Sequence, residues 1–193
     1  MSLINFYKEN MKMIHKCWVN QIAMSAFGLM VTLPIHALSQ NKGYGNLPII
    51  AVSIFAIGFY CFINYDAFWD WGTRVSLKSK NNQNSSPKLA LKIGMFAYIP
   101  TAILTVAMIL FYYISSLGDV ALAGNISGVC SLLLSVIVHG MYNGLMWVLT
   151  AKYSILFILF LIPMPLTCYL GYSIGSKGKK LYGKYVPSDD LKK

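Results

Sequence analysis

Five long apolar stretches dominate this chain, and they cover residues 17–39, 47–65, 93–117, 120–149 and 153–175. A hydrocarbon core of about 30 Å is crossed by about 20 helical residues, so each stretch is long enough to span a bilayer. Only 11% of the residues are charged, whereas soluble domains average about 25%. The sequence therefore predicts an all-α fold, a polytopic membrane helix bundle of about five transmembrane helices that forms one domain over residues 1–176.

Residues 1–16 have the pattern of an amphipathic helix. Lysines recur at every fourth position on one side, and apolar residues gather on the other side: Leu3, Ile4, Tyr7, Met11 and Ile14. This pattern predicts an interfacial helix in the headgroup region, with a frayed polar tail as the alternative. The segment lacks the features of a cleavable signal peptide, so the first apolar stretch would act as a signal anchor.

The positive charges predict the orientation, because basic residues favour the cytoplasmic side. Lysines of residues 1–16 and a basic cluster within loop 66–92 lie on the same side if two spans separate them, and the turn between those spans carries only Lys42. We therefore expect the N-terminus and loop 66–92 to be cytoplasmic. The basic C-terminal tail, residues 177–193, conflicts with five complete spans, which would place it outside.

A hairpin that re-enters from the outer face would remove this conflict. Backbone of that kind is tolerated only where protein or water covers it. The sequence leaves open whether 120–149 is one tilted helix, a broken helix or a re-entrant segment. Kinks are expected at Pro34, Pro100 and the Pro163–Pro165 pair, because proline removes a backbone donor and clashes with the preceding turn.

The fourth apolar stretch carries polar residues at strict i+4 spacing. Ser127 opens this row, and the residues that follow are candidate ligand-binding residues: Ser131, Ser135, His139 and Asn143. His139 is the strongest of these, because an ionisable side chain inside a membrane favours a functional role. Hydrogen bonds between helices, worth about 0.6 kcal/mol each, are the alternative explanation for the whole row.

Small residues at the same spacing predict close helix packing. Three Gly-x-x-x-Gly patterns supply them: Gly124, Gly128, Gly140, Gly144, Gly171 and Gly175. Glycines in such a pattern let a second backbone approach closely. We therefore expect the fourth and fifth segments to pack together.

At the end of the second span, acidic, aromatic and basic residues form a candidate docking surface: Asp66, Trp69, Asp70, Trp71 and Arg74. Asp70 and Arg74 have the i, i+4 spacing of a helical ion pair. The simpler interpretation is a helix that extends beyond the bilayer and is anchored by its tryptophans.

The residue inventory argues against catalysis. The chain has six carboxylates, and none lies in the middle of a span. The segment His139-Gly-Met-Tyr-Asn143 resembles the last motif, His-x-x-x-Asn, of the intramembrane CAAX-type protease family. That family also requires paired glutamates, and Glu9 is the single glutamate here. We therefore expect no catalytic residues, no metal site, no cofactor and no enzymatic activity.

Three classes of function remain, in order of preference. The first is a non-enzymatic subunit or accessory of a membrane assembly such as a transporter. The second is a small-molecule carrier or binding subunit with its site on the fourth helix, and the third is an intramembrane enzyme. The net charge of +10 lies mostly beside the spans, which favours anionic lipid headgroups as partners over nucleic acid.

Overall fold

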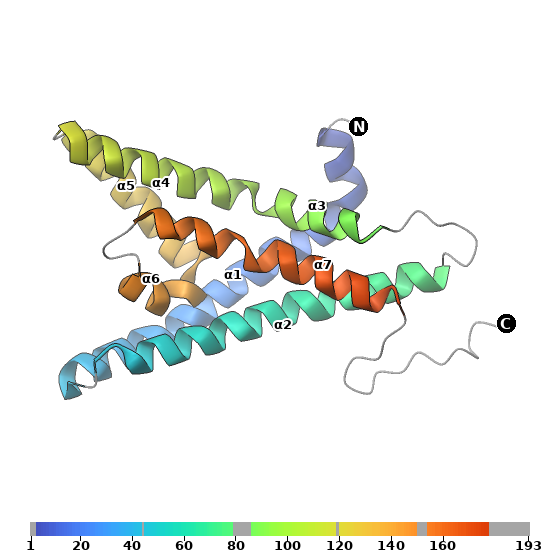
Figure 1. Cartoon of the computed structure of the whole chain (residues 1–193), viewed down its shortest axis with the longest axis horizontal. Coiled ribbons are helices and arrows are strands. Elements are labelled where there is room, and N and C mark those ends of the chain that lie inside the picture. Colours follow the sequence, from blue (N-terminus) through green and yellow to red (C-terminus); the bar gives the residue numbers. More distant parts are fainter. Residues whose placement is uncertain (1–2, 44, 79–85, 119, 150–153, 178–193) are drawn as a thin grey trace.

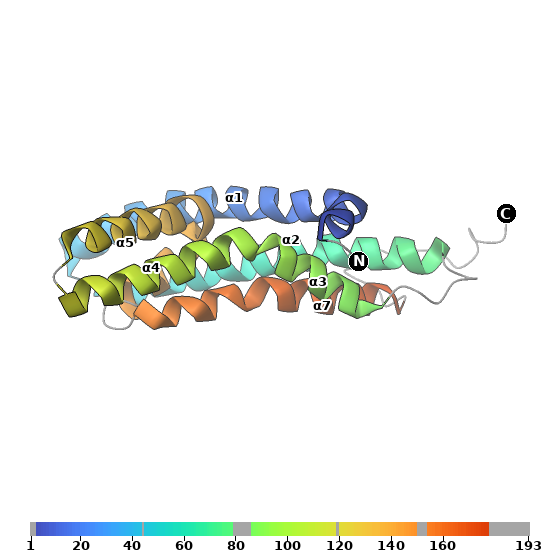
Figure 2. The same cartoon turned by 90° about the horizontal axis from the view of Figure 1, so that it is seen from above.

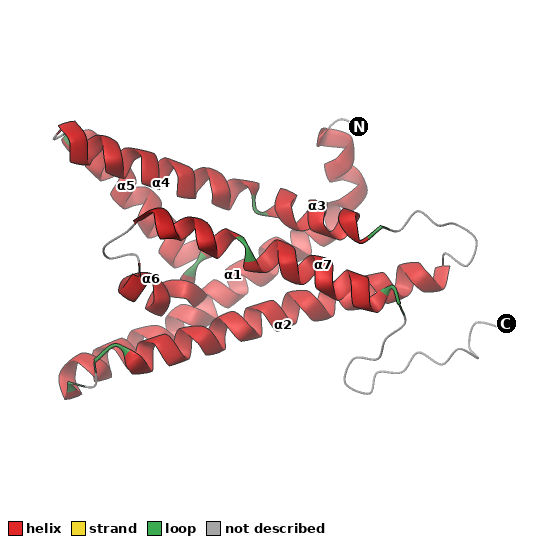
Figure 3. Ribbon diagram, in the orientation of Figure 1, coloured by secondary structure: helices red, strands yellow, loops and turns green. Residues whose placement is uncertain are grey.

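The computed structural model describes residues 3–43, 45–78, 86–118, 120–149 and 154–177. These residues form helices joined by short loops, with no strand among them (Figure 3). Five of the helical stretches are long and apolar enough to cross a bilayer. The prediction of an all-α membrane bundle is confirmed, and the chain is an integral membrane protein.

The first helix, α1 (Leu3–Lys42), is unbroken over 40 residues. The segment expected as a separate interfacial helix is therefore the first part of α1, and Figure 1 shows these turns bent away from the rest of the helix. The apolar face expected there is divided, since Ile14 is buried but Leu3 and Ile4 are exposed. Pro34 lies inside α1 and does not end it.

The second helix, α2 (Leu47–Lys78), returns along α1 and has 32 residues. At a rise of 1.5 Å per residue its length is about 48 Å, which exceeds a hydrocarbon core of about 30 Å. The expected extension beyond the second span is thus helical as far as Lys78.

The third apolar stretch consists of two helices, α3 (Pro87–Ala97) and α4 (Ile99–Gly118), which meet at Tyr98. Ser86 caps α3, because its side chain accepts a hydrogen bond from the amide of Lys88. The break lies just before Pro100, whose ring would clash with the carbonyl four residues earlier in a continuous helix. The expected disturbance at Pro100 is therefore present.

The fourth apolar stretch reverses direction. It consists of α5 (Ala121–Leu133), the π-helical turn η1 (Leu134–Val138), the 3-10 turn η2 (Gly140–Tyr142) and α6 (Asn143–Leu149). We call this unit, residues 121–149, the reversing segment. It does not form one ridge from end to end, so the uninterrupted i+4 row expected from Ser127 to Asn143 is wrong.

Neighbouring helices show the path of the reversing segment. Near its start, the Ser127 hydroxyl donates to the carbonyl of Met108 on α4 (3.0 Å). At the turn, the carbonyl of Val136 meets Ser25 in the middle of α1. Beyond the turn, Trp147 lies 4.6 Å from His36, between ring centroids, nearer the end of α1. The chain thus enters from the end where α4 finishes and returns toward that end (Figure 1).

The fifth stretch runs the length of the bundle as η3 (Ser154–Leu161), a 3-10 helix, and α7 (Pro163–Gly175). The expected kink at the proline pair takes the form of a change from 3-10 to α geometry at Pro163. The end of α7 and the start of α1 lie at the same end of the bundle, which we call the terminal end; the other end is the distal end (Figure 1).

The helices pack in layers around a continuous core. Figure 2 shows α1 and α5 on one side of the bundle and α7 on the other, with α2 and α4 between them. Tyr60, Tyr142 and Tyr172 are among the largest fully buried side chains. Polar bonds also join helices, as where the Gln21 amide donates to the Thr101 hydroxyl (3.2 Å).

Candidate functional site

The turn at His139 leaves backbone groups that an ordinary helix would pair. The amide of His139 donates to the carbonyl of Leu134 (2.6 Å), which is the five-residue step of a π-turn. Ser25 of α1 supplies the missing partners, since its hydroxyl donates to the carbonyl of Val136 (2.9 Å) and accepts from the amide of Gly140 (2.7 Å). Broken helices are stable at membrane depth only when such groups are paired again.

Two further side chains complete the turn. The Asn143 amide nitrogen donates back to the carbonyl of Ser135 (3.1 Å), and the hydroxyl of Ser53 on α2 accepts from the amide of Gly144 (2.8 Å). The reversal therefore depends on partners from α1, from α2 and from the reversing segment itself.

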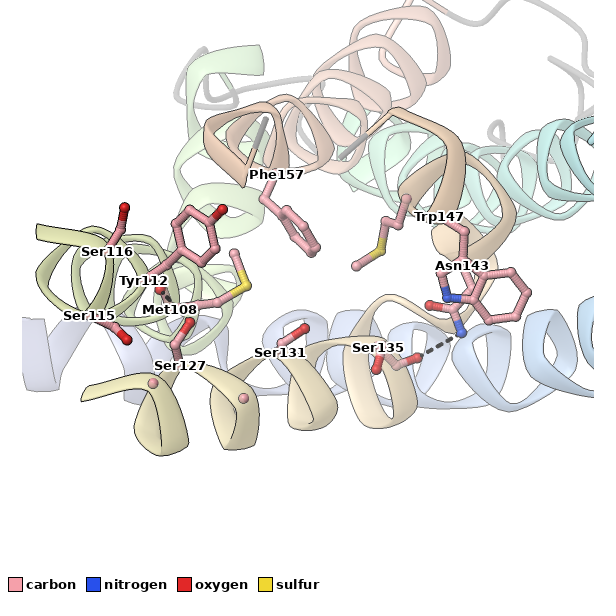
Figure 4. A pocket seen from close by; sticks show the side chains of 13 residues that line it. Met108, Tyr112, Ser115, Ser116, Ser127, Ser131, Ser135, Asn143, Trp147 and Phe157 are labelled. Atoms are coloured by element: carbon pink, nitrogen blue, oxygen red, sulfur yellow. Dashed lines mark hydrogen bonds between the residues drawn. The ribbon is translucent and has the colours of Figure 1, made fainter. Parts of the chain in front are cut away.

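A cavity of about 680 Å³ lies in the angle of the reversing segment. Figure 4 shows Ser127, Ser131 and Ser135 along one side, Phe157 across from them, and Asn143 with Trp147 at one end. Tyr112, Ser115 and Ser116 of α4 lie at the other end (Figure 4). The remaining described lining residues are Met108, Gly124, Gly128 and Met146. None of the described lining residues is charged.

The structure brings three of the four candidate ligand-binding residues to this cavity: Ser131, Ser135 and Asn143. His139 is not among its lining residues. The π-turn rotates the chain just before His139, so this side chain leaves the face that the serines share. The expectation that all four residues share one face is wrong for this reason.

His139 lies instead in the core of the bundle and is 0% exposed. Its ring meets Tyr142 edge-on at 5.2 Å and Phe160 at 6.3 Å, between ring centroids. Neither ring nitrogen has a hydrogen-bond partner among the described residues. The ring of His139 therefore packs as part of the bundle core.

Several lining residues were not expected from the sequence. Ser127 is the exception, because it opens the polar row that is visible in the sequence. Tyr112, Ser115 and Ser116 lie near the end of α4, and Phe157 lies on η3. Their sequence neighbourhoods are uniformly apolar or turn-like, so nothing in the local pattern separates them from lipid-facing residues.

The glycines divide into two groups. A β-carbon on Gly171 or Gly175 would collide with the carbonyl oxygens of Tyr65 or Trp69 on α2. The fifth segment therefore uses these glycines against α2, and the expectation that they face the fourth segment is wrong. The glycines of the turn face other helices too, with Gly140 against Ser25 and Gly144 against Ile49 and Ser53.

The first glycine pair of the reversing segment lies in more open surroundings. Gly124 faces the Ser115 side chain, and a β-carbon on Gly128 would meet nothing within 4 Å. The two glycines line the cavity.

The expected docking surface is only partly accessible. Trp69 is 4% exposed, and its backbone lies against Gly175 of α7. Trp71 lies 4.8 Å from Tyr172, between ring centroids. Asp70 and Arg74 form the expected ion pair (3.0 Å) and are exposed, with 45% and 71% of their side chains accessible. Docking through these charges and the half-buried Asp66 stays a prediction.

No group of three or more histidine, cysteine or acidic residues that could hold a metal ion occurs within the described ranges. No protein-family model matches the chain, and neither do any of the curated proteins or solved structures compared with it.

Proposed function

We propose that this integral membrane protein is a carrier or binding subunit that holds a small molecule in the cavity of the reversing segment. The cavity is the observation that carries the proposal: its volume of about 680 Å³ lies within the range of about 300–1,000 Å³ usual for ligand sites. A few polar groups among apolar and aromatic side chains are also typical of such sites.

Binding without catalysis fits the lining. Its described residues supply serine hydroxyls and one amide but no carboxylate, histidine, cysteine or lysine. A serine needs an adjacent base to act as a nucleophile, and His139 lies outside the cavity.

The test is native mass spectrometry of the particle released gently from native membranes. We expect a stoichiometric small molecule on the wild-type protein. Gly128→Phe should abolish it, because the new side chain enters the cavity without meeting other atoms close to its β-carbon. Gly58→Phe is the matched control, since Gly58 is equally uncrowded but does not line the cavity.

Retention of the ligand by Gly128→Phe would contradict the proposed site. A particle that contains other polypeptides and no small molecule would instead support the accessory subunit of a membrane assembly.

We propose further that the terminal end faces the cytoplasm and meets anionic lipid headgroups. The start of α1, the end of α2 and the whole of α3 lie at this end (Figure 1), and these helix parts contain Lys8, Lys12, Arg74, Lys88 and Lys92. Because the reversing segment returns to the distal end, the described helices make four crossings, and this even number would leave both termini on the same side of the bilayer. The tail beyond Lys177 lies outside the described residues.

Topology reporters fused to the two termini test this orientation. We expect both reporters to give a cytoplasmic signal in intact cells. A cytoplasmic N-terminal signal with an external C-terminal signal would show that residues 121–149 cross the bilayer completely.

A further inference from the structure

One polar atom in the cavity is buried and unpaired. Asn143 is 2% exposed, and its oxygen Oδ1 has no hydrogen-bond partner within the described part of the chain. The nitrogen of the same amide donates to the carbonyl of Ser135. This bond settles the orientation of the amide, because exchanging the two atoms would set Oδ1 against another oxygen. Asn143 therefore contributes an acceptor and not a donor to the cavity.

Two serines reinforce this character. The hydroxyl of Ser127 donates to the carbonyl of Met108 (3.0 Å), and the hydroxyl of Ser135 donates to the carbonyl of Leu132 (3.1 Å). A hydroxyl whose proton is engaged still has lone pairs that accept a hydrogen bond. Asn143, Ser127 and Ser135 thus present acceptors, and a ligand that pairs with these three groups must bring donors.

The rest of the lining restricts the ligand further. A charged ligand would lose its hydration without an opposite charge among the described lining residues, which is unfavourable in a low-dielectric site. Tyr112, Trp147 and Phe157 supply aromatic surface, which favours a flat apolar group. His36 lies against the ring of Trp147 and restricts its movement.

Building on the proposed binding function, we propose that the ligand is an uncharged molecule with a flat apolar part and an N–H or O–H donor. Asn143 is the residue that selects for this donor, through a hydrogen bond to Oδ1. Leaving a buried acceptor unpaired is unfavourable, so molecules without the donor bind more weakly.

A matched set of indoles tests the proposal on the full chain in phosphatidylcholine nanodiscs. Indole has the donor and no charge, 1-methylindole lacks the donor, tryptamine is a cation and indole-3-acetate is an anion. We expect calorimetry to show that indole binds about threefold to tenfold more tightly than 1-methylindole, as one net hydrogen bond allows. The two charged probes should bind more weakly than indole.

Variants assign the selectivity to its source. Asn143→Ala should bind indole and 1-methylindole equally, and Gly128→Phe should bind neither, whereas Gly58→Phe should behave like the wild type. Should Asn143→Ala fail to fold, the comparison of indole with 1-methylindole on the wild-type protein still decides the matter.

Equal or tighter binding of 1-methylindole to the wild type would overturn the proposal. Absence of binding by every indole, beyond uptake by empty nanodiscs, would overturn it as well. The proposed function is judged separately, by the small molecule that the native particle carries. A ligand there that is charged or lacks a donor would leave the cavity in place and remove the role of Asn143.

Discussion

The α2–α7 contact and the α4–α5 contact use glycines at the same spacing in opposite ways. Gly171 and Gly175 lie directly on backbone atoms of α2, whereas Gly128 has open space in front of it. At the α2–α7 contact the two backbones touch and leave no room for a side chain at these glycines. At the α4–α5 contact the space in front of Gly128 is part of the cavity. A Gly-x-x-x-Gly pattern therefore predicts a smooth helix surface, and the neighbouring backbone decides whether that surface is closed or open.

The largest effect that tests this comparison comes from a leucine at Gly175. The carbonyl of Trp69 occupies the position that a β-carbon would need, so Gly175→Leu should destabilise the protein by about 3 kcal/mol or more. Thermal unfolding in nanodiscs measures this loss. Gly128→Leu is the matched control and should change stability by less than about 1 kcal/mol. Similar losses in both variants would show that the two contacts do not differ.

A smaller effect is expected at the turn of the reversing segment. Gly140 lies against the backbone of Ser25, so even Gly140→Ala should cost about 2 kcal/mol. Gly58→Ala, on the uncrowded face of α2, serves as its control. If the unfolding midpoint of Gly140→Ala equals that of the control, the turn does not pack against α1 as described.

Removal of one hydroxyl should have a moderate effect. Ser25→Ala leaves the carbonyl of Val136 and the amide of Gly140 without their partner, which should cost about 1–2 kcal/mol. Ser131→Ala removes a hydroxyl from the cavity wall and should change stability by less than about 0.5 kcal/mol. The difference between the two unfolding free energies separates a structural serine from a lining serine. If the two variants have equal unfolding free energies, Ser25 does not hold the turn.

The smallest effect concerns the exposed ion pair between Asp70 and Arg74 on α2. Asp70→Asn should cost no more than about 0.5 kcal/mol, because pairs at i, i+4 on a helix surface contribute little. Unfolding at low and high salt measures it, and the cost should shrink as salt screens the charges. A loss above 2 kcal/mol would instead indicate a role in packing against α7.

The sequence predicts most of the fold where the cause is local. Apolar length locates the helices, the ring of Pro100 accounts for the break at Tyr98, and the spacing of Asp70 and Arg74 accounts for their ion pair. Each of these three features depends only on residues that lie within a few positions of one another in the sequence.

The reversal at His139 could not be predicted in the same way. It depends on Ser53, which is 91 residues from Gly144 in sequence, and on Ser25, which is 115 residues from Gly140. The cavity likewise combines the polar row with the end of α4 and with η3. The row of serines correctly indicated one wall of the cavity. The same i+4 spacing assumes a continuous helix, so it wrongly predicted that His139 belongs to this wall.

The dependence of the reversing segment on Ser25 and Ser53 has a consequence for biosynthesis. In lipid alone, residues 121–149 would expose unpaired amide and carbonyl groups at the turn. The two serines belong to α1 and α2, which leave the ribosome earlier, so their hydroxyls are already in the membrane when the segment emerges. The order of synthesis therefore matches the order of assembly, with the first two helices acting as a template for the insertion of the fourth stretch.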